Sequence, residues 1–222
     1  MKILKDIQDE LGKFLSGKTV DTIVPPIVYL LMNNLFTLKI AIGSSLILAV
    51  MFSIYRLFKK ESILYALLGI SGVVIASVFA LFSDNSTNYF LPKIIGSGFL
   101  FLGILISLLI GRPAAAILSH LSRGWTFSWF MRKDIKPAYQ EVTIAWGVLV
   151  LIRTLLQLYL YQRGNLTELG WASILLGFPA TLTVLILTLV YGVWRLKKLG
   201  GPGIEEYEEG KEPPWEGQKK GF

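Results

Sequence analysis

The chain has 222 residues, of which 53% are hydrophobic and 17% are charged, and its mean hydropathy is positive at +0.58. This balance is too apolar for one water-soluble core, so a lipid bilayer is the expected solvent. The net charge is +7, cysteine is absent and His120 is the one histidine, which excludes disulfide frameworks, thiol nucleophiles and multi-histidine metal sites.

The first segment, residues 1–18, is charged and has apolar residues at the spacing of an amphipathic helix: Ile3, Leu4, Ile7, Leu11, Phe14 and Leu15. We expect an amphipathic interfacial helix on the cytoplasmic membrane surface. Packing of the same helix on the rest of the protein is the alternative.

Residues 19–198 are predicted to form a transmembrane domain, because about 20 apolar residues cross the hydrocarbon as a helix. The first span is the weakest, since Pro25 and Pro26 lie near its start and Asn33 and Asn34 near its end. We interpret it as a short or tilted span, with a re-entrant segment as the alternative. The six predicted spans are Val20–Leu35, Leu38–Leu57, Ser62–Phe82, Phe90–Ile110, Thr143–Tyr161 and Gly170–Trp194.

Orientation follows from the positive charges. Eighteen of the 22 Lys and Arg residues are counted with the segment before the first span or with those that follow the second, fourth and sixth spans, including the last residues of a span. The other loops are counted with three, which are Lys39, Lys93 and Arg163. Cytoplasmic segments carry this excess. The fold class is therefore all-α, a polytopic membrane helix bundle with six transmembrane helices and both termini in the cytoplasm. The expected location is the bacterial cytoplasmic (inner) membrane.

Two segments lie outside the spans. Residues 111–142 form a cytoplasmic loop that mixes aromatic and basic residues, which predicts a place in the membrane interface. Residues 199–222 form an acidic, Gly- and Pro-rich C-terminal tail without apolar periodicity. We expect this tail to be disordered or loosely ordered unless a partner holds it.

The main candidate site is Arg153, in the middle of "WGVLVLIRTLLQLYLY". All fifteen acids lie outside the apolar cores, so none can pair with it at that depth. Helical spacing places Trp146, Gln157 and Tyr161 on its face. Asn33 and Asn34 are candidate partners from the first span. We expect Arg153 to face the bundle interior and to hydrogen-bond neutral groups or carbonyls of the first, fourth or sixth span.

Two roles for Arg153 stay open: it ties spans together through carbonyls, or it binds an anionic group of a ligand or lipid. The expected ligand-binding or structural polar core is Arg153, Gln157, Asn33, Asn34, Trp146 and Tyr161. No catalytic residues, metal site or cofactor is predicted, because the sequence carries no enzyme signature.

The order of features resembles a known family. The segments "IVPPIVYLLM", "YRLFKKESILYALLGISGVVIASVFAL", "NYFLPKIIGSGFLFLGILISLLIGRP" and "AYQEVTIAWGVLVLIRTLLQLYLY" are similar to an uncharacterised family of bacterial integral membrane proteins, frequent in actinobacteria (domain of unknown function 3159). More distantly, they resemble the intracellular septation protein A family, whose pattern has no arginine at the position of Arg153. The resemblance covers about Thr19 to Leu196 and implies an inner-membrane protein with an envelope role.

The expected function is that of a non-enzymatic integral membrane protein that organises or assists membrane or envelope complexes. The alternative is a small transporter or lipid-handling protein whose buried arginine binds an anionic group. A cofactor- or pigment-binding subunit of a larger complex is the third candidate. The expected partners are membrane lipids, proteins bound through the tail and the 111–142 loop, and a second copy of the chain, whereas nucleic acid is excluded by the placement of the charges.

Overall fold

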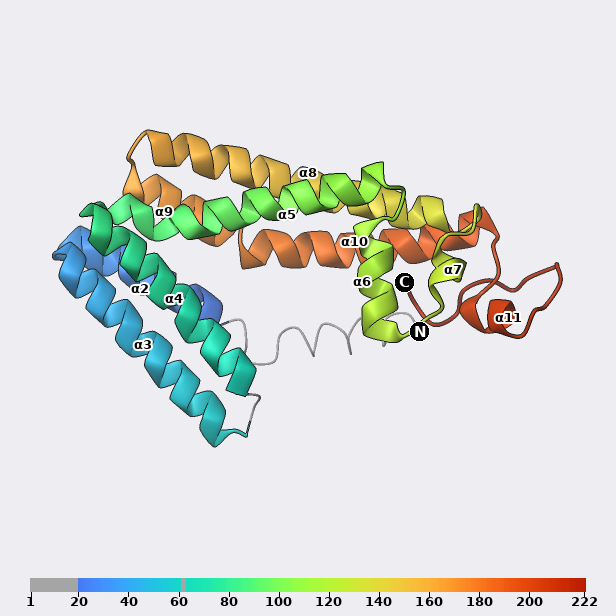
Figure 1. Cartoon of the computed structure of the whole chain (residues 1–222), viewed down its shortest axis with the longest axis horizontal. Helices are drawn as coiled ribbons and strands as arrows, with labels where there is room; N and C mark the ends of the chain where they lie inside the picture. The colour runs from blue at the N-terminus through green and yellow to red at the C-terminus, as the bar shows by residue number, and fades with distance from the viewer. Residues whose placement is uncertain (1–19, 61–62) are drawn as a thin grey trace. The chain divides into compact units, whose positions relative to one another are not determined.

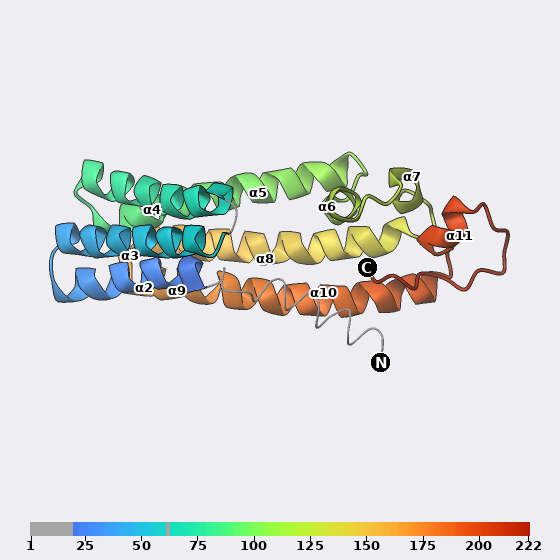
Figure 2. The same cartoon turned by 90° about the horizontal axis from the view of Figure 1, so that it is seen from below.

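The computed structural model describes residues 20–60 and 63–222, and every regular element within them is helical. Figures 1 and 2 show these helices from two sides. The chain divides into two compact units, which we call unit 1 and unit 2. Unit 1 contains Gly98–Ile152 and Leu182–Phe222, and unit 2 contains the described residues up to Ser97 together with Arg153–Thr181. The predicted helix over residues 1–18 lies outside the described residues.

Unit 2 begins with three helices that lie side by side (Figures 1 and 2) and are followed by a short 3₁₀ helix. The four elements are α2 (Val20–Leu35), α3 (Leu38–Phe58), α4 (Ile63–Ser83) and η1 (Ser86–Phe90). The Asn85 side chain caps η1 by accepting a hydrogen bond from the Thr87 N–H at 2.9 Å. The unit also holds the start of α5 (Leu91–Leu109), the end of α8 (Lys136–Gln162), α9 (Leu166–Leu175) and the start of α10 (Phe178–Leu199).

The core of unit 2 is apolar and is centred on an aromatic stack. The rings of Tyr29 and Tyr89 lie parallel, with centroids 3.7 Å apart, and Phe90 packs edge-on against both. Leu169 and Leu160 complete the cluster from α9 and α8. This packing fixes η1 and therefore the first turn of α5, which follows it directly.

Unit 1 contains the rest of α5, α8 and α10, with three short helices: α6 (Ala114–Arg123), α7 (Phe127–Phe130) and α11 (Ile204–Glu208). Its core packs Trp129 and Phe130 against Tyr139. We expected residues 111–142 to place their aromatic rings at the membrane interface, but Trp129 and Phe130 are fully buried in protein. The Trp129 indole N–H is satisfied there, because it donates to the Pro202 carbonyl oxygen at 3.0 Å.

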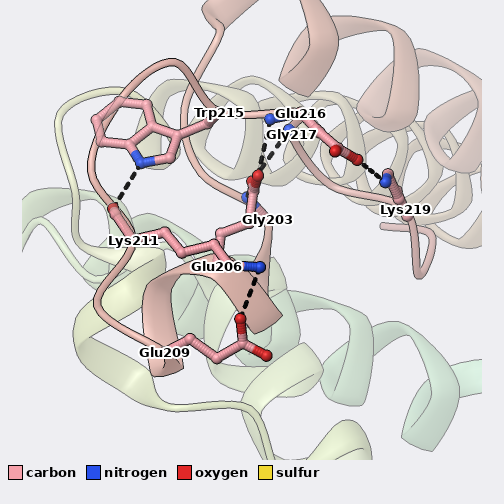
Figure 3. A network of polar contacts seen from close by, with 8 residues as sticks. All are labelled: Gly203, Glu206, Glu209, Lys211, Trp215, Glu216, Gly217 and Lys219. Atoms are coloured by element: carbon pink, nitrogen blue, oxygen red, sulfur yellow. Dashed lines mark hydrogen bonds and ion pairs between the residues drawn. The ribbon is translucent and has the colours of Figure 1, made fainter.

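The C-terminal tail is folded, so the prediction of disorder was wrong. Figure 3 shows the reason: the Glu206 carboxylate accepts hydrogen bonds from the backbone N–H groups of Gly203, Glu216 and Gly217, at 2.8 to 3.1 Å. The Tyr207 hydroxyl also bonds Ser128 of α7, at 3.0 Å. Composition does not reveal such long-range contacts, which help to hold the tail.

The far end of the tail packs against helices of the same unit. The Phe222 ring stacks on Tyr139 with centroids 4.3 Å apart, and its carbonyl oxygen accepts a hydrogen bond from Arg123 at 2.7 Å. Gly192 of α10 makes this packing sterically possible, because a Cβ atom there would lie 2.3 Å from the Phe222 ring. The tail is thus part of the core of unit 1.

Within the described residues, five helical segments are long and apolar enough to cross a membrane, and Ile23–Leu35 is a shorter apolar helix. The all-helical fold with several apolar spans is therefore confirmed. Two helices differ in their limits from the predicted apolar spans. The helix that contains the fifth span begins at Lys136 and not at Thr143, because α8 continues into the polar segment before it. The sixth span is not one helix from Gly170 to Trp194, since it is interrupted between α9 and α10 (Figure 1).

Candidate functional site

The interruption between α9 and α10 frees a backbone carbonyl inside unit 2. In a continuous α-helix the Gly177 N–H would donate to the Ser173 carbonyl oxygen four residues earlier. It donates to Ile174 instead, at 3.2 Å. Pro179, two residues later, has no N–H to continue the helical pattern. The Ser173 carbonyl oxygen is therefore available to another donor.

That donor is the side chain of Lys93, whose Nζ atom lies 2.8 Å from the Ser173 carbonyl oxygen. Lys93 is the third residue of α5, so the aromatic core that fixes η1 also positions it. Gly177 provides the space: a Cβ atom there would lie 2.7 Å from the Ser173 oxygen and 3.4 Å from the Lys93 Nζ atom. An ammonium group thus takes the place of the missing helical N–H.

The second cation of the site is Arg153 on α8. It lies on the inward face of the helix, where Val150 and Gln157 are buried, whereas Ile152 and Leu155 on other faces are exposed. Its Nε atom is buried and has no hydrogen-bond partner among the described residues. We expected Arg153 to bond the carbonyls of other spans, but Lys93 makes the bond to the freed carbonyl.

Gln157, one helical turn after Arg153, is fully buried. Its Nε2 atom donates to the Ser173 hydroxyl at 3.0 Å, whereas its Oε1 atom has no partner among the described residues. Ser173 therefore contacts both Gln157, through its hydroxyl, and Lys93, through its carbonyl. We call the group of Lys93, Arg153, Gln157 and Ser173 the polar site.

The polar site carries two positive charges and no negative one. Ser173 links the helices of the two cations: its carbonyl oxygen accepts a hydrogen bond from Lys93, and its hydroxyl accepts one from Gln157, which lies one helical turn after Arg153. In the part of the chain that the structure describes, no carboxylate pairs with either cation. Lys93 is exposed and Arg153 is half-buried, and no negative charge among the described residues offsets their two positive charges, so an anion between them would be favourable. Such a site can bind a carboxylate, a phosphate or a similar group.

The other residues predicted for the site have other partners. The Asn33 Oδ1 atom accepts a hydrogen bond from the Ser86 hydroxyl at 2.7 Å, and Asn34 lies 3.4 Å from the Thr167 hydroxyl. The Tyr161 hydroxyl donates to the Asn88 side chain at 2.6 Å. These contacts connect the loop ends of α2 and α8 to η1 and α9, within unit 2. Trp146 belongs to unit 1, where it packs on the core of that unit.

Sequence reasoning missed Lys93 and Ser173. Lys93 was counted as a loop cation, although it already lies inside the predicted span Phe90–Ile110. That position was the available signal, because a lysine inside an apolar run needs a partner as much as an arginine does. Nothing in the local sequence marks Ser173, which matters only because the helix ends beside it.

A group of three or more His, Cys, Asp or Glu side chains that could hold a metal ion is not found within residues 20–60 and 63–222. The polar site itself contains no group of these types, and its cations disfavour a metal ion.

Comparison with known proteins identifies the family. No curated protein and no solved structure shows significant similarity to the chain. A family model described as "Protein of unknown function (DUF3159)" matches residues 16–198, which include all four residues of the polar site and the apolar spans up to the last residue of the final one. The chain is therefore a member of the DUF3159 family.

Proposed function

We propose that this protein is a membrane-embedded binding protein that takes up an anionic group at the polar site, as a small transporter or a lipid-handling protein does. One observation carries the proposal: Lys93 bonds Ser173, Arg153 lies one helical turn from Gln157, which also bonds Ser173, and neither cation has a carboxylate partner among the described residues. A purely structural arginine would be expected to use its donors on carbonyls, whereas the Arg153 Nε atom has no partner.

The interrupted helix supports the same function. Many transporters bind their substrates near the middle of the membrane, where two half-helices meet and backbone groups are exposed to the ligand. Here α9 and α10 meet beside Lys93, and both cations come from other helices. This analogy concerns the local geometry alone.

The proposed location is the bacterial cytoplasmic membrane, with both termini in the cytoplasm, because of the distribution of Lys and Arg. Reporter fusions after Lys60 and after Asp84 test this orientation, since α4 lies between the two positions. Opposite sides are expected. Equal readings from the two fusions would exclude the orientation.

The binding function is tested by the lipids that the purified protein retains. The full chain is extracted from bilayers of phosphatidylglycerol and phosphatidylcholine with identical acyl chains, and retained lipids are counted by native mass spectrometry. The wild type should prefer the anionic lipid. Lys93→Met and Arg153→Leu should each bring the ratio close to that of the bilayer, because each removes one of two charges.

Arg163→Leu is the matched control. Arg163 is an exposed cation of unit 2 that lies over the Tyr159 ring, away from the polar site. Its replacement should leave the ratio unchanged. The proposal fails if Lys93→Met and Arg153→Leu retain the wild-type ratio.

A role in organising membrane complexes remains a second proposal, now with less support. It depended partly on a tail free to bind other proteins. That tail packs on unit 1, where Phe222, Ile204 and Pro202 are buried. A stoichiometric protein partner, isolated with the full-length chain, would favour this second role.

A further inference from the structure

A pocket of about 630 Å³ lies in unit 2, between α3, α4 and the start of α5. Its walls are mainly apolar, and the wall formed by α4 includes two glycines, which have no side chains. The residues that matter here are Phe52 and Ala49 on α3 with Gly69, Gly72, Val73 and Ala76 on α4. The Ser53 hydroxyl, also on the wall, donates to the Ala66 carbonyl oxygen at 3.1 Å, so it does not require a ligand.

Two cationic side chains line the pocket, one near the end of α3 and one near the start of α5. Lys93, which belongs to the polar site, lines the pocket beside Pro92, and Arg56 of the last turn of α3 lines it as well. No carboxylate is among the lining residues, all of which lie in the described part of the chain. The pocket thus combines an apolar surface with cationic groups, which matches a molecule with an apolar body and an anionic group.

We propose that this pocket binds an acyl chain of an anionic lipid whose charged group interacts with Lys93. The inference rests on the proposed function and specifies its ligand. Lys93 connects the two, because the same ammonium group lies at the freed Ser173 carbonyl and on the pocket wall.

The size of the pocket decides between a lipid chain and a protein helix as the occupant. Pockets for small molecules have volumes of about 300–1,000 Å³, and the observed 630 Å³ falls in that range. A transmembrane helix about 10 Å wide and 30 Å long would occupy roughly 2,000 Å³. The pocket is too small for such a helix, so the acyl chain is favoured.

Gly72 allows the pocket to be filled without a clash. A Cβ atom at Gly72 would meet no heavy atom within 4 Å, so Gly72→Leu should place its side chain in the pocket. Leu is also a better helix former than Gly, so α4 should fold normally. Gly43→Leu is the matched control, because Gly43 on α3 has the same free space and does not line the pocket.

The experiment measures the affinity of each variant for phosphatidylglycerol and phosphatidylcholine with identical acyl chains, by native mass spectrometry of the full chain. Gly72→Leu should weaken binding of both lipids by about tenfold, which corresponds to the burial of roughly two methylene groups. It should leave the preference for the anionic lipid unchanged. Lys93→Met should instead reduce that preference, and Gly43→Leu should behave as the wild type.

The outcomes separate the two proposals. If Gly72→Leu binds both lipids as the wild type does while Lys93→Met loses the preference, the pocket does not hold the chain and the acyl-chain inference is overturned, although the anion site stands. If Lys93→Met and Arg153→Leu keep the preference, the proposed function itself is wrong. Equal weakening by Gly72→Leu and Gly43→Leu would also overturn the inference, because the effect would not depend on the pocket.

Discussion

The Lys93 ammonium group donates to the Ser173 carbonyl oxygen at the point where α9 ends, 2.8 Å away. Replacing it in Lys93→Met leaves this carbonyl without its donor, although it also removes one of the two positive charges of the polar site. Because an unsatisfied carbonyl in apolar surroundings is unfavourable, we expect a net loss of about 1 kcal/mol of stability. Thermal unfolding in detergent measures it, with Lys39→Met as the control, because Lys39 is an exposed lysine in the first turn of α3. A rise in the melting temperature would contradict this prediction.

Arg153→Leu should have the opposite effect on stability. The Arg153 Nε atom is buried without a partner, so the variant removes an uncompensated charge and adds apolar contacts. We expect the melting temperature to stay constant or to rise, while the preference for anionic lipid is lost. Arg153→Lys keeps the charge and should keep part of that preference. A clear drop in melting temperature for Arg153→Leu would show that the arginine serves mainly to hold helices together.

Gly192→Ala should detach the end of the tail from α10. A Cβ atom at this position would lie 2.3 Å from the Phe222 ring, so the ring must leave its place on Tyr139. Loss of a buried aromatic contact typically costs about 1–3 kcal/mol when the neighbours can adjust. Limited proteolysis of the tail measures the change. Gly98→Ala, which meets no atom within 4 Å, should leave the cleavage rate unchanged, and an equally resistant tail in both variants would contradict the prediction.

Glu206→Gln should loosen the tail itself. The carboxylate accepts three backbone hydrogen bonds (Figure 3), and bonds to a charged acceptor are stronger than those to a neutral amide. We expect a loss of about 1–2 kcal/mol in local stability, seen as faster hydrogen exchange at Gly203, Glu216 and Gly217. Glu209→Gln removes an exposed pair with Lys211 and should have little effect. Similar exchange in wild type and Glu206→Gln would mean that other contacts hold the tail.

Lowering the pH should weaken the ion pair between Lys220 and Glu205 in the tail, and this effect can be separated from the titration of other groups. The hydrogen bond from Lys220 lowers the pKa of the Glu205 carboxyl below its usual value. Because this pKa is lower in the folded than in the unfolded chain, the stabilisation is fully present above the unfolded value of about 4.3 and is lost as the pH falls through the folded value.

The measurement is a pH titration of fluorine-labelled Trp215, assigned with Trp215→Phe. Trp215 reports on the tail because its indole N–H donates to the Lys211 carbonyl oxygen. Other carboxylates titrate in the same range, so the difference between wild type and Glu205→Gln isolates the contribution of Glu205. Identical titration curves for the two proteins would rule out a role for this pair.

The limits of the helices could be predicted from the sequence where they depend on hydropathy alone. The limits of α2 and the start of α3 follow from the polar Asn33 and Asn34 and the renewed apolar run at Leu38, and the structure places them there. The break at Gly177 could not be predicted in this way, because the residues around it are as apolar as a continuous helix. Hydropathy measures the environment of side chains and not the path of the backbone.

The candidate site was predictable in part for the same reason. Arg153 and Gln157 were evident as polar residues in an apolar helix, and the structure puts them on its inward side. Their neighbours Lys93 and Ser173 come from segments 60 residues upstream and 20 residues downstream of Arg153, as the numbering shows. Spacing along the chain carries no information on contacts at that separation, and tail contacts such as Tyr207 with Ser128 were missed for this reason as well.

The hydrogen bonds that η1 forms with α2 and α8 would transmit movement of these helices to α5. This short helix receives Tyr29 and Asn33 from α2 and Tyr161 from α8, and it ends three residues before Lys93. A rigid turn that is joined directly to α5 transmits its displacement to that lysine. Opening the loop ends of α2 and α8 would therefore pull the ammonium group from the Ser173 carbonyl, and under the proposed function this would couple release of the anion to rearrangement of these loops.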